Sequence, residues 1–452
     1  DCVSDNTAIG KSALGVFTGS NATVIGSYAA DAATTATDIV AIGKDALGNT
    51  KTGGYCTAVG FAAGRAAISP NNTFIGNAAG YAVGDAQHVI AIGKEALGGG
   101  TFTYKNQGDY NIAIGSYALD ATTTGANNIA IGYGTGTAIN TGANNILIGT
   151  NAGNVLTDNA SNIAIGYSAM DAATGGENYN IAVGVNALGA ENSNAVGCVA
   201  IGHGALGTQN RAASLNTAIG YAALTNLGSG VTYGGVRNTA VGYLAGGLGV
   251  VGGSGSTDGD DNCFVGYGAG YRVTTGKQNS IVGSFAGHDL TSGENNVMHG
   301  LRSGYNATTA KENVIIGYDA CGLGVLANAA STQGMYNVVV GPQAGYDLTS
   351  GESNILLGKD AGANITTGDH NIVLGTHALD ALNGANARTI AIGNNAMGAD
   401  TQNSSYCVAI GDHALALMNA DVKNTAIGGL AGDAIVGGTA NTLLGYSSGS
   451  SI

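Results

Sequence analysis

The residues of this 452-residue sequence that could bind a metal ion are concentrated in one acidic loop. Asp258, Asp260 and Asp261 lie close together there, and carboxylate oxygens are ligands that Ca²⁺ prefers. Their spacing matches neither an EF-hand loop nor the calcium-binding nonapeptide repeat. We therefore treat these carboxylates as weak candidates for a Ca²⁺ site and favour a solvated, glycine-rich loop.

The six cysteines and seven histidines are scattered along the chain. Cys56, Cys198 and Cys407 lie at one position of a repeat described below, many repeats apart, and a disulfide needs α-carbons within about 7 Å. Cys263 and Cys321 are separated by three repeats. We predict buried free thiols, no metal-ligand set, no cofactor and no catalytic residue, because the sequence also lacks a nucleophile motif and a paired-carboxylate signal.

Six sequons could accept glycans if the chain is secreted, although a sequence rich in Asn and Thr forms sequons by chance. They begin at Asn21, Asn71, Asn159, Asn306, Asn364 and Asn403.

Composition excludes several classes of protein. Glycine supplies 79 residues and proline 2, and only 10% of residues are charged. Collagen needs a strict glycine period with abundant proline, and a disordered chain lacks the regularly placed apolar residues seen here. The net charge of -14 predicts no nucleic-acid partner, and no apolar run is long enough to span a membrane.

An internal repeat organises the sequence from residue 6 onward. Its anchor is a glycine preceded by three residues that are mostly apolar, as in Asn162 to Gly166. Of the 24 intervals between 25 successive anchors, 13 are 17 residues long and seven are 16 or 18. We predict one continuous repeat array over residues 1-452, with loop insertions in the four longer intervals, at 98-110, 225-237, 246-261 and 322-336.

The apolar run before each anchor predicts a short β-strand that glycine turns. A three-residue strand is unstable alone, but copies stacked about 4.8 Å apart form a long parallel sheet. The predicted fold class is therefore all-β, a parallel β-solenoid (β-helix or β-roll) of about 25 coils with a roughly 17-residue repeat. Asparagine four residues before the anchor predicts a corner at which stacked amides form a structural ladder, for example at Asn111, Asn128, Asn145, Asn162 and Asn180.

Both faces of the predicted strand are apolar, as is typical of strands that are covered on both sides. We expect the residues one and three before the anchor to line the coil interior, with His299 as a tolerated substitution there. The middle residue, usually alanine, would then pack against another chain, most simply in a homotrimeric fibre.

The repeat resembles known fibrous proteins. Asn162 to Met170 (NIAIGYSAM) and Asn216 to Leu224 (NTAIGYAAL) look like the N-x-A-I-G-x-x-A repeats of trimeric autotransporter adhesin heads and of bacteriophage tail-fibre-like proteins. The resemblance covers almost the whole chain and implies a trimeric, extracellular fibre on a cell surface or virion that touches host cells. The adhesin repeat is usually nearer 14 residues, and the chain shows no membrane anchor, coiled-coil stalk or chaperone domain.

We predict a non-enzymatic structural or adhesive protein, a tail-fibre or adhesin shaft that presents surface-binding loops to cell-surface glycans or receptors. One alternative is a subunit of a self-assembling extracellular filament, stacked end to end, because repeats without capping segments leave open rungs. Another is a tailspike-like polysaccharide-degrading enzyme, since such enzymes build carboxylate sites on β-helices.

Overall fold

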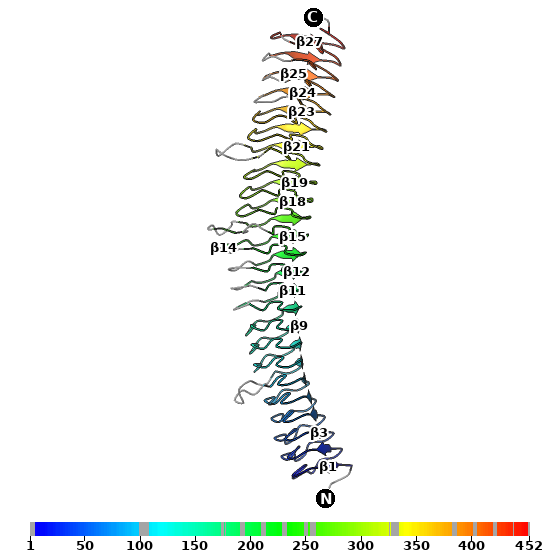
Figure 1. Ribbon diagram of the computed structural model, residues 1–452, viewed down its shortest axis with the longest axis vertical. Coiled ribbons are helices and arrows are strands. Elements are labelled where there is room, and N and C mark those ends of the chain that lie inside the picture. Colours follow the sequence, from blue (N-terminus) through cyan, green and yellow to red (C-terminus); the bar gives the residue numbers. More distant parts are fainter. Residues whose placement is uncertain are drawn as a thin grey trace. The chain divides into compact units, whose positions relative to one another are not determined.

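The computed structural model describes residues 5–98, 108–172, 176, 178–189, 195–208, 214–227, 233–247, 252–253, 259–324, 326, 334–381, 387–400, 405–418, 423–436 and 438–450. Within these residues there is no helix, and so none that could cross a membrane. The chain divides into two compact units, Asp1–Asn216 and Thr217–Ile452. Each unit consists of short parallel strands stacked rung upon rung, as the ribbon in Figure 1 shows.

The first unit contains twelve of these strands among its described residues, and each pairs in parallel with the next. The strands are β1 Thr7–Ile9, β2 Thr23–Ile25, β3 Val40–Ile42, β4 Thr57–Val59, β5 Thr73–Ile75, β6 Ile90–Ile92, β7 Ile112–Ile114, β8 Ile129–Ile131, β9 Ile146–Ile148, β10 Ile163–Ile165, β11 Ile181–Val183 and β12 Val199–Ile201.

The second unit adds thirteen parallel strands of the same kind within its described part. They are β13 Thr217–Ile219, β15 Thr239–Val241, β17 Cys263–Val265, β18 Ser280–Val282, β19 Val297–His299, β20 Val314–Ile316, β21 Val338–Val340, β22 Ile355–Leu357, β23 Ile372–Leu374, β24 Ile390–Ile392, β25 Val408–Ile410, β26 Thr425–Ile427 and β27 Thr442–Leu444.

The predicted fold class, an all-β parallel solenoid with a repeat of about 17 residues, is confirmed. Strand register follows the repeat, so that Ile129 pairs with Ile146 and Ile131 with Ile148. Two of the predicted insertions meet in the second unit, where β14 (Tyr233–Gly234) pairs antiparallel with β16 (Gly252–Gly253). The insertions therefore join to each other outside the main sheet.

The anchor glycine has a steric role wherever another coil is stacked on it, as at Gly132. The φ of Gly132 is +140°, a value that other residues rarely adopt, and a β-carbon there would lie 2.6 Å from the carbonyl oxygen of Gly149 in the next coil. The strand therefore ends where two backbones come too close for any side chain. This contact explains why the repeat keeps a glycine at its anchor.

The predicted orientation of the strand is wrong. The middle residue points into the coil, where Ala41, Ala113 and Ala164 are completely buried, and its two neighbours point outward and are partly exposed. A small side chain such as alanine fits on the inner side of the strand, because residues on the far side of the coil, such as Leu119, fill most of its interior. The alanines consequently cannot pack against another chain.

His299, which was predicted to lie in the coil interior, is also on the outer side. It lies on the outward face of β19, and its Nε2 is 3.1 Å from the hydroxyl oxygen of Ser280 on the neighbouring β18. A polar ring is tolerated at this position because solvent reaches it.

The interior is filled in two ways, which define two kinds of coil. In what we call a leucine coil, the middle strand residue is Ala113 and the space opposite is taken by Leu119, four residues after the anchor. In a glycine coil, the residue four after the anchor is glycine, and a larger middle residue of the same or the next coil fills the space, as Leu147 does at Gly153 and Gly136. Both patterns leave the backbone of the coil unchanged, since φ is +51° at Leu119 and +57° at Gly153.

Candidate binding groove

The asparagine corner forms a continuous ladder of buried amides. Asn145 donates from its backbone N–H and from Nδ2 to Oδ1 of Asn128, at 3.1 and 3.0 Å, and Nδ2 also donates to the carbonyl of Asn159 at 2.9 Å. In turn, Oδ1 of Asn145 accepts the backbone N–H of Asn162 at 3.0 Å. At the ends of this run, Nδ2 of Asn111 donates to the carbonyls of Gly108 and Gly125, and Oδ1 of Asn180 accepts the N–H of Cys198. The amides are used within the chain and hold one coil to the next.

The acidic loop is tied to a neighbouring coil by an arginine. Arg237 donates from Nε to Asp261 at 2.6 Å and from Nη2 to Asp260 at 3.4 Å, and the backbone N–H of Val236 donates to Asp260 at 2.9 Å. Bonding to Arg237 lowers the pKa of Asp261. Asp258 lies outside the described residues, and the described part of the chain holds no group of three His, Cys, Asp or Glu side chains that could bind a metal ion.

The thiols lie in the positions that the repeat assigns. Cys56, Cys198, Cys321 and Cys407 are buried and form no disulfide, and Cys263 is partly exposed on the outward face of β17. Burial raises the pKa of Cys56, and it raises that of Cys321 to about 12. A thiol with a raised pKa is a poor nucleophile near neutral pH.

The sequons differ in accessibility. Asn21, Asn71 and Asn364 are exposed, and Asn306 is partly buried with its Nδ2 bonded to the carbonyl of Leu323. Asn159 is buried, and its Oδ1 accepts the backbone N–H of Thr157. Asn403 is outside the described residues. A glycan could reach the first three side chains without disturbing the fold.

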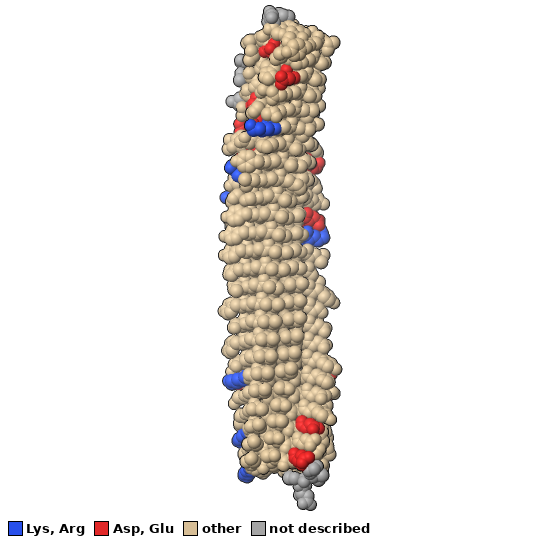
Figure 2. All heavy atoms as spheres, turned by 90° about the vertical axis from the view of Figure 1, so that its right-hand side faces the viewer, with Lys and Arg blue, Asp and Glu red and all other residues tan. Residues whose placement is uncertain are grey.

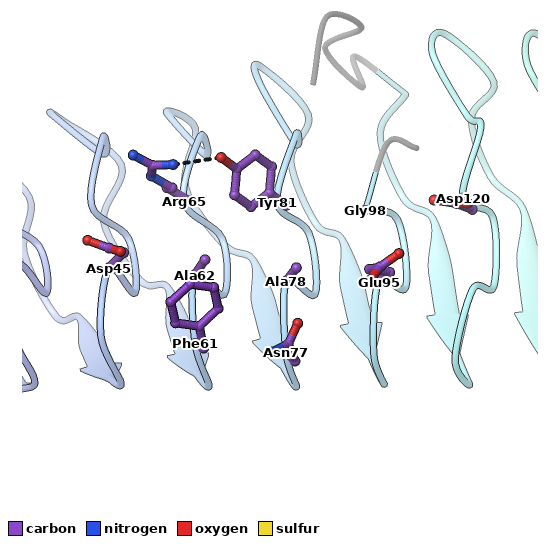
Figure 3. Close-up of a pocket in the computed structure, with 10 residues that line it drawn as sticks. All are labelled: Asp45, Phe61, Ala62, Arg65, Asn77, Ala78, Tyr81, Glu95, Gly98 and Asp120. Carbon is purple, nitrogen blue, oxygen red and sulfur yellow. Dashed lines mark hydrogen bonds between the residues drawn. The ribbon is translucent and has the colours of Figure 1, made fainter. Parts of the chain in front are cut away.

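The first unit contains a groove of about 410 Å³ that crosses the side of several coils. One wall carries residues one or two positions after the anchor, among them Phe61 and Glu95, and the other carries residues five positions after it. Along this second wall, Figure 3 shows Arg65, Tyr81, Gly98 and Asp120 in successive coils. Because Gly98 has no side chain, the groove is open between the ring of Tyr81 and the carboxyl group of Asp120.

Aromatic and charged groups are held in place around this groove. Arg65 donates from Nη1 to the hydroxyl of Tyr81 at 2.6 Å and lies over its ring, with 5.6 Å to the ring centroid. Burial raises the pKa of Asp120, and the negative charge of Glu95 adds to the effect. Lys94 lies 3.4 Å from Glu95 and donates to the hydroxyl of Tyr117. The groove therefore combines apolar rings with hydrogen-bonding carboxyl groups, the usual chemistry of a small-ligand site.

A ladder of aromatic rings lies on the second unit. The rings of Tyr221, Tyr243 and Tyr267 stack at 5.1 Å between successive centroids. His288 stacks in the same way between Tyr271 and Tyr305, at 5.0 and 4.8 Å. Stacked rings cover one another's faces, so these residues stabilise the surface.

Sequence reasoning missed the groove. It looked for recognition in the four insertions, whereas Phe61, Arg65, Tyr81 and Asp120 come from ordinary coils and only Gly98 belongs to a predicted insertion, 98-110. A signal was present in the column five residues after the anchor, where an arginine, a tyrosine, a glycine and an aspartate follow one another in adjacent repeats. Comparing columns across coils could have identified it.

No protein-family model matches the sequence, and a search of curated proteins finds no similar one. The interpretation of this chain therefore depends on its own residues and geometry.

Proposed function

We propose that this chain is a fibrous structural protein, the shaft of a tail fibre or adhesin on a virion or cell surface. The observation that carries the proposal is the uniformity of the coils. The same strand, anchor and corner recur through both units, and substitutions in the interior compensate one another, so each unit is constructed as a stack of equivalent coils. A stack of equivalent coils supports a long element more directly than it supports a single reaction centre.

Electron microscopy of the purified full chain tests the shaft. Isolated rods of one length are expected. Filaments of unlimited length would instead favour the second proposal made from the sequence, a self-assembling filament subunit. Compact particles would contradict both.

For the adhesive role, we propose that the groove of the first unit binds saccharides. A sugar ring can stack on Tyr81 at the level of Gly98, while the carboxyl groups of Glu95 and Asp120 accept hydrogen bonds from its hydroxyls. A glycan array with the wild-type chain and Tyr81→Ala provides the test. We expect at least a tenfold loss of binding for Tyr81→Ala and no change for Tyr133→Ala, an exposed ring that does not line the groove.

One observation favours a second function, polysaccharide cleavage of the tailspike type. Glycoside hydrolysis needs two carboxyl groups, one of them protonated near neutral pH. Asp120 and Glu95 both line the groove, and burial raises the pKa of Asp120, which is the direction that a general acid needs. Incubating bacterial surface polysaccharides with wild type, Asp120→Asn and Glu95→Gln would reveal cleavage that both substitutions abolish. Binding without any release of saccharide would leave adhesion as the function.

A further inference from the structure

The outward face of the strands is a long uncharged surface of each unit. It is made by the residues one and three before each anchor, and among the 25 described three-residue strands none of them is Lys, Arg, Asp or Glu. Charged side chains are also sparse on the face of the molecule that Figure 2 shows. Side chains such as Ile75, Ile131 and Ile201 are 36% to 39% exposed. Exposed apolar patches of more than a few hundred Å² mark interaction surfaces.

Each unit has a block in which both outward residues are aliphatic at every rung. In the first unit it runs from β6 to β12, and in the second from β20 to β25. We call these two stretches the aliphatic blocks. Outside them, threonine, serine, cysteine or histidine often takes one of the two places, as at Thr57 on β4. The clustering of isoleucine and valine in the blocks has no explanation in the coil interior, because these side chains point away from it.

We infer that this face is covered by the same face of a second copy of the chain, so that two solenoids form a β-sandwich. Parallel sheets are found almost only with both faces covered, and two flat sheets pack about 10 Å apart. Within the described strands the face carries no Lys, Arg, Asp or Glu and repeats with the register of the coils, so it is complementary to itself. A self-complementary patch is what a two-fold interface requires.

The available area is sufficient. Twelve rungs about 4.8 Å apart and three residues wide present roughly 600 Å² in one unit. The same area on a second copy gives about 1,200 Å² in total, which reaches the lower end of the range for specific interfaces. Exposed rings at the margin, such as Tyr133 and Tyr167 directly after their anchors, add to the surface. Tyrosine is enriched in interfaces, whereas charged residues are depleted from their centres.

The same geometry opposes the homotrimer expected from the sequence. That expectation depended on an exposed alanine face, and the alanines are inside the coil. A closed trimer needs two different contact surfaces on each chain, whereas one flat face satisfies a two-fold pair. A paired shaft is compatible with the proposed fibre. The pairing itself is inferred only from the outward face of the strands and does not depend on the proposed function.

Light scattering after size-exclusion chromatography at tens of micromolar tests the inference. We expect a mass twice the 44.1 kDa of one chain. The double variant Ile146→Glu with Ile148→Glu places charge in the centre of an aliphatic block and should elute as a monomer. Thr124→Glu, which adds one such charge at an exposed position off the strand, should stay paired.

A milder variant guards against misfolding. Ile146→Thr with Ile148→Thr uses a residue that the same face carries at Thr57 and Thr73, so the coil should fold and association should weaken at least tenfold. A monomeric wild type, a mass three times that of one chain, or pairing unaffected by the glutamates would each overturn the inference. If the protein were monomeric and micrographs still showed rods, the pairing would be wrong but the proposed shaft function would remain. The two proposals can therefore be tested separately.

Discussion

A leucine coil and a glycine coil of the same unit differ in every large interior side chain and yet have the same outline. In the coil anchored at Gly115, the interior is filled by Leu119, with alanine on the strand. In the coil anchored at Gly149, Leu147 on the strand and Leu156 on the far side fill the space above Gly153. A β-carbon at Gly153 would lie 2.9 Å from both leucines, so the glycine is needed to make room.

The comparison shows that the coil conserves interior volume and leaves the identity of the residues free. Close packing requires this, because a cavity the size of one side chain costs several kcal/mol of stability and too large a side chain is also destabilising. The compensation also extends to the neighbouring coil. Phe74 on β5 contacts the positions of Gly64 in the preceding coil and Gly80 in its own, and Phe264 on β17 similarly faces Gly246 and Gly270.

The strongest way to break this compensation is to remove the large member. Phe74→Ala should destabilise the protein by about 3–5 kcal/mol, because the glycines beside it cannot fill the cavity. Chemical denaturation followed by circular dichroism measures the loss. Phe61→Ala, which truncates a ring that is 49% exposed on the adjacent coil, is the matched control and should have little effect. Equal losses for the two variants would contradict the volume argument.

The next test adds volume where there is none. Gly80→Leu places a side chain against the ring of Phe74 and should cost about 3 kcal/mol. Leucine itself suits this backbone, as Leu97 shows at the same place in the next coil with φ of +48°. The double variant Phe74→Ala with Gly80→Leu converts the coil to the leucine kind and should recover most of the stability, though not all, because Gly64 stays unfilled.

The control for backbone strain is Gly204→Leu. Its φ is +63° and a β-carbon there would meet nothing within 4 Å, so only the conformational cost is felt. If the double variant were no more stable than Gly80→Leu alone, the two kinds of coil would not be interchangeable.

The fold and its period could be predicted because both depend on local chemistry repeated many times. An apolar triplet that ends in a glycine at high φ describes the strand and its turn, and the 17-residue spacing describes the register. The orientation of the strand could not be predicted in the same way, since both faces are apolar and the decision depends on Leu119 and its equivalents filling the coil from the far wall. The groove escaped prediction because its lining comes from several adjacent coils, whose residues differ at the positions one, two and five after the anchor.

The asparagine corner should respond alike in both kinds of coil, in contrast to the interior. Asn145→Ala in a glycine coil and Asn111→Ala in a leucine coil each leave buried donors and acceptors of the neighbouring coils without their partner. A loss of about 2 kcal/mol is expected for each, measured by denaturation. Asn127→Ala, on the exposed side of the same corner, serves as the control and should cost less. A large difference between the two buried variants would show that the kind of coil also controls the corner.

Substituting Cys321 should have the smallest effect on stability. Cys321 takes the place of the leucine, four residues after the anchor, in a coil whose strand already carries Ile315. Burial raises the pKa of its thiol from the ordinary 9.0 to about 12. The folded state therefore keeps the proton that the unfolded chain releases, and the stability that this provides is present below pH 9 and is lost as the pH rises toward 12. The free energy of unfolding of wild type should fall relative to Cys321→Ala by up to about 1.4 kcal/mol per pH unit in that window. Alanine occupies the equivalent place at Ala30, so the control fits the coil. Parallel pH curves for the two proteins would mean that water reaches the thiol and that the interior of this coil is not closed.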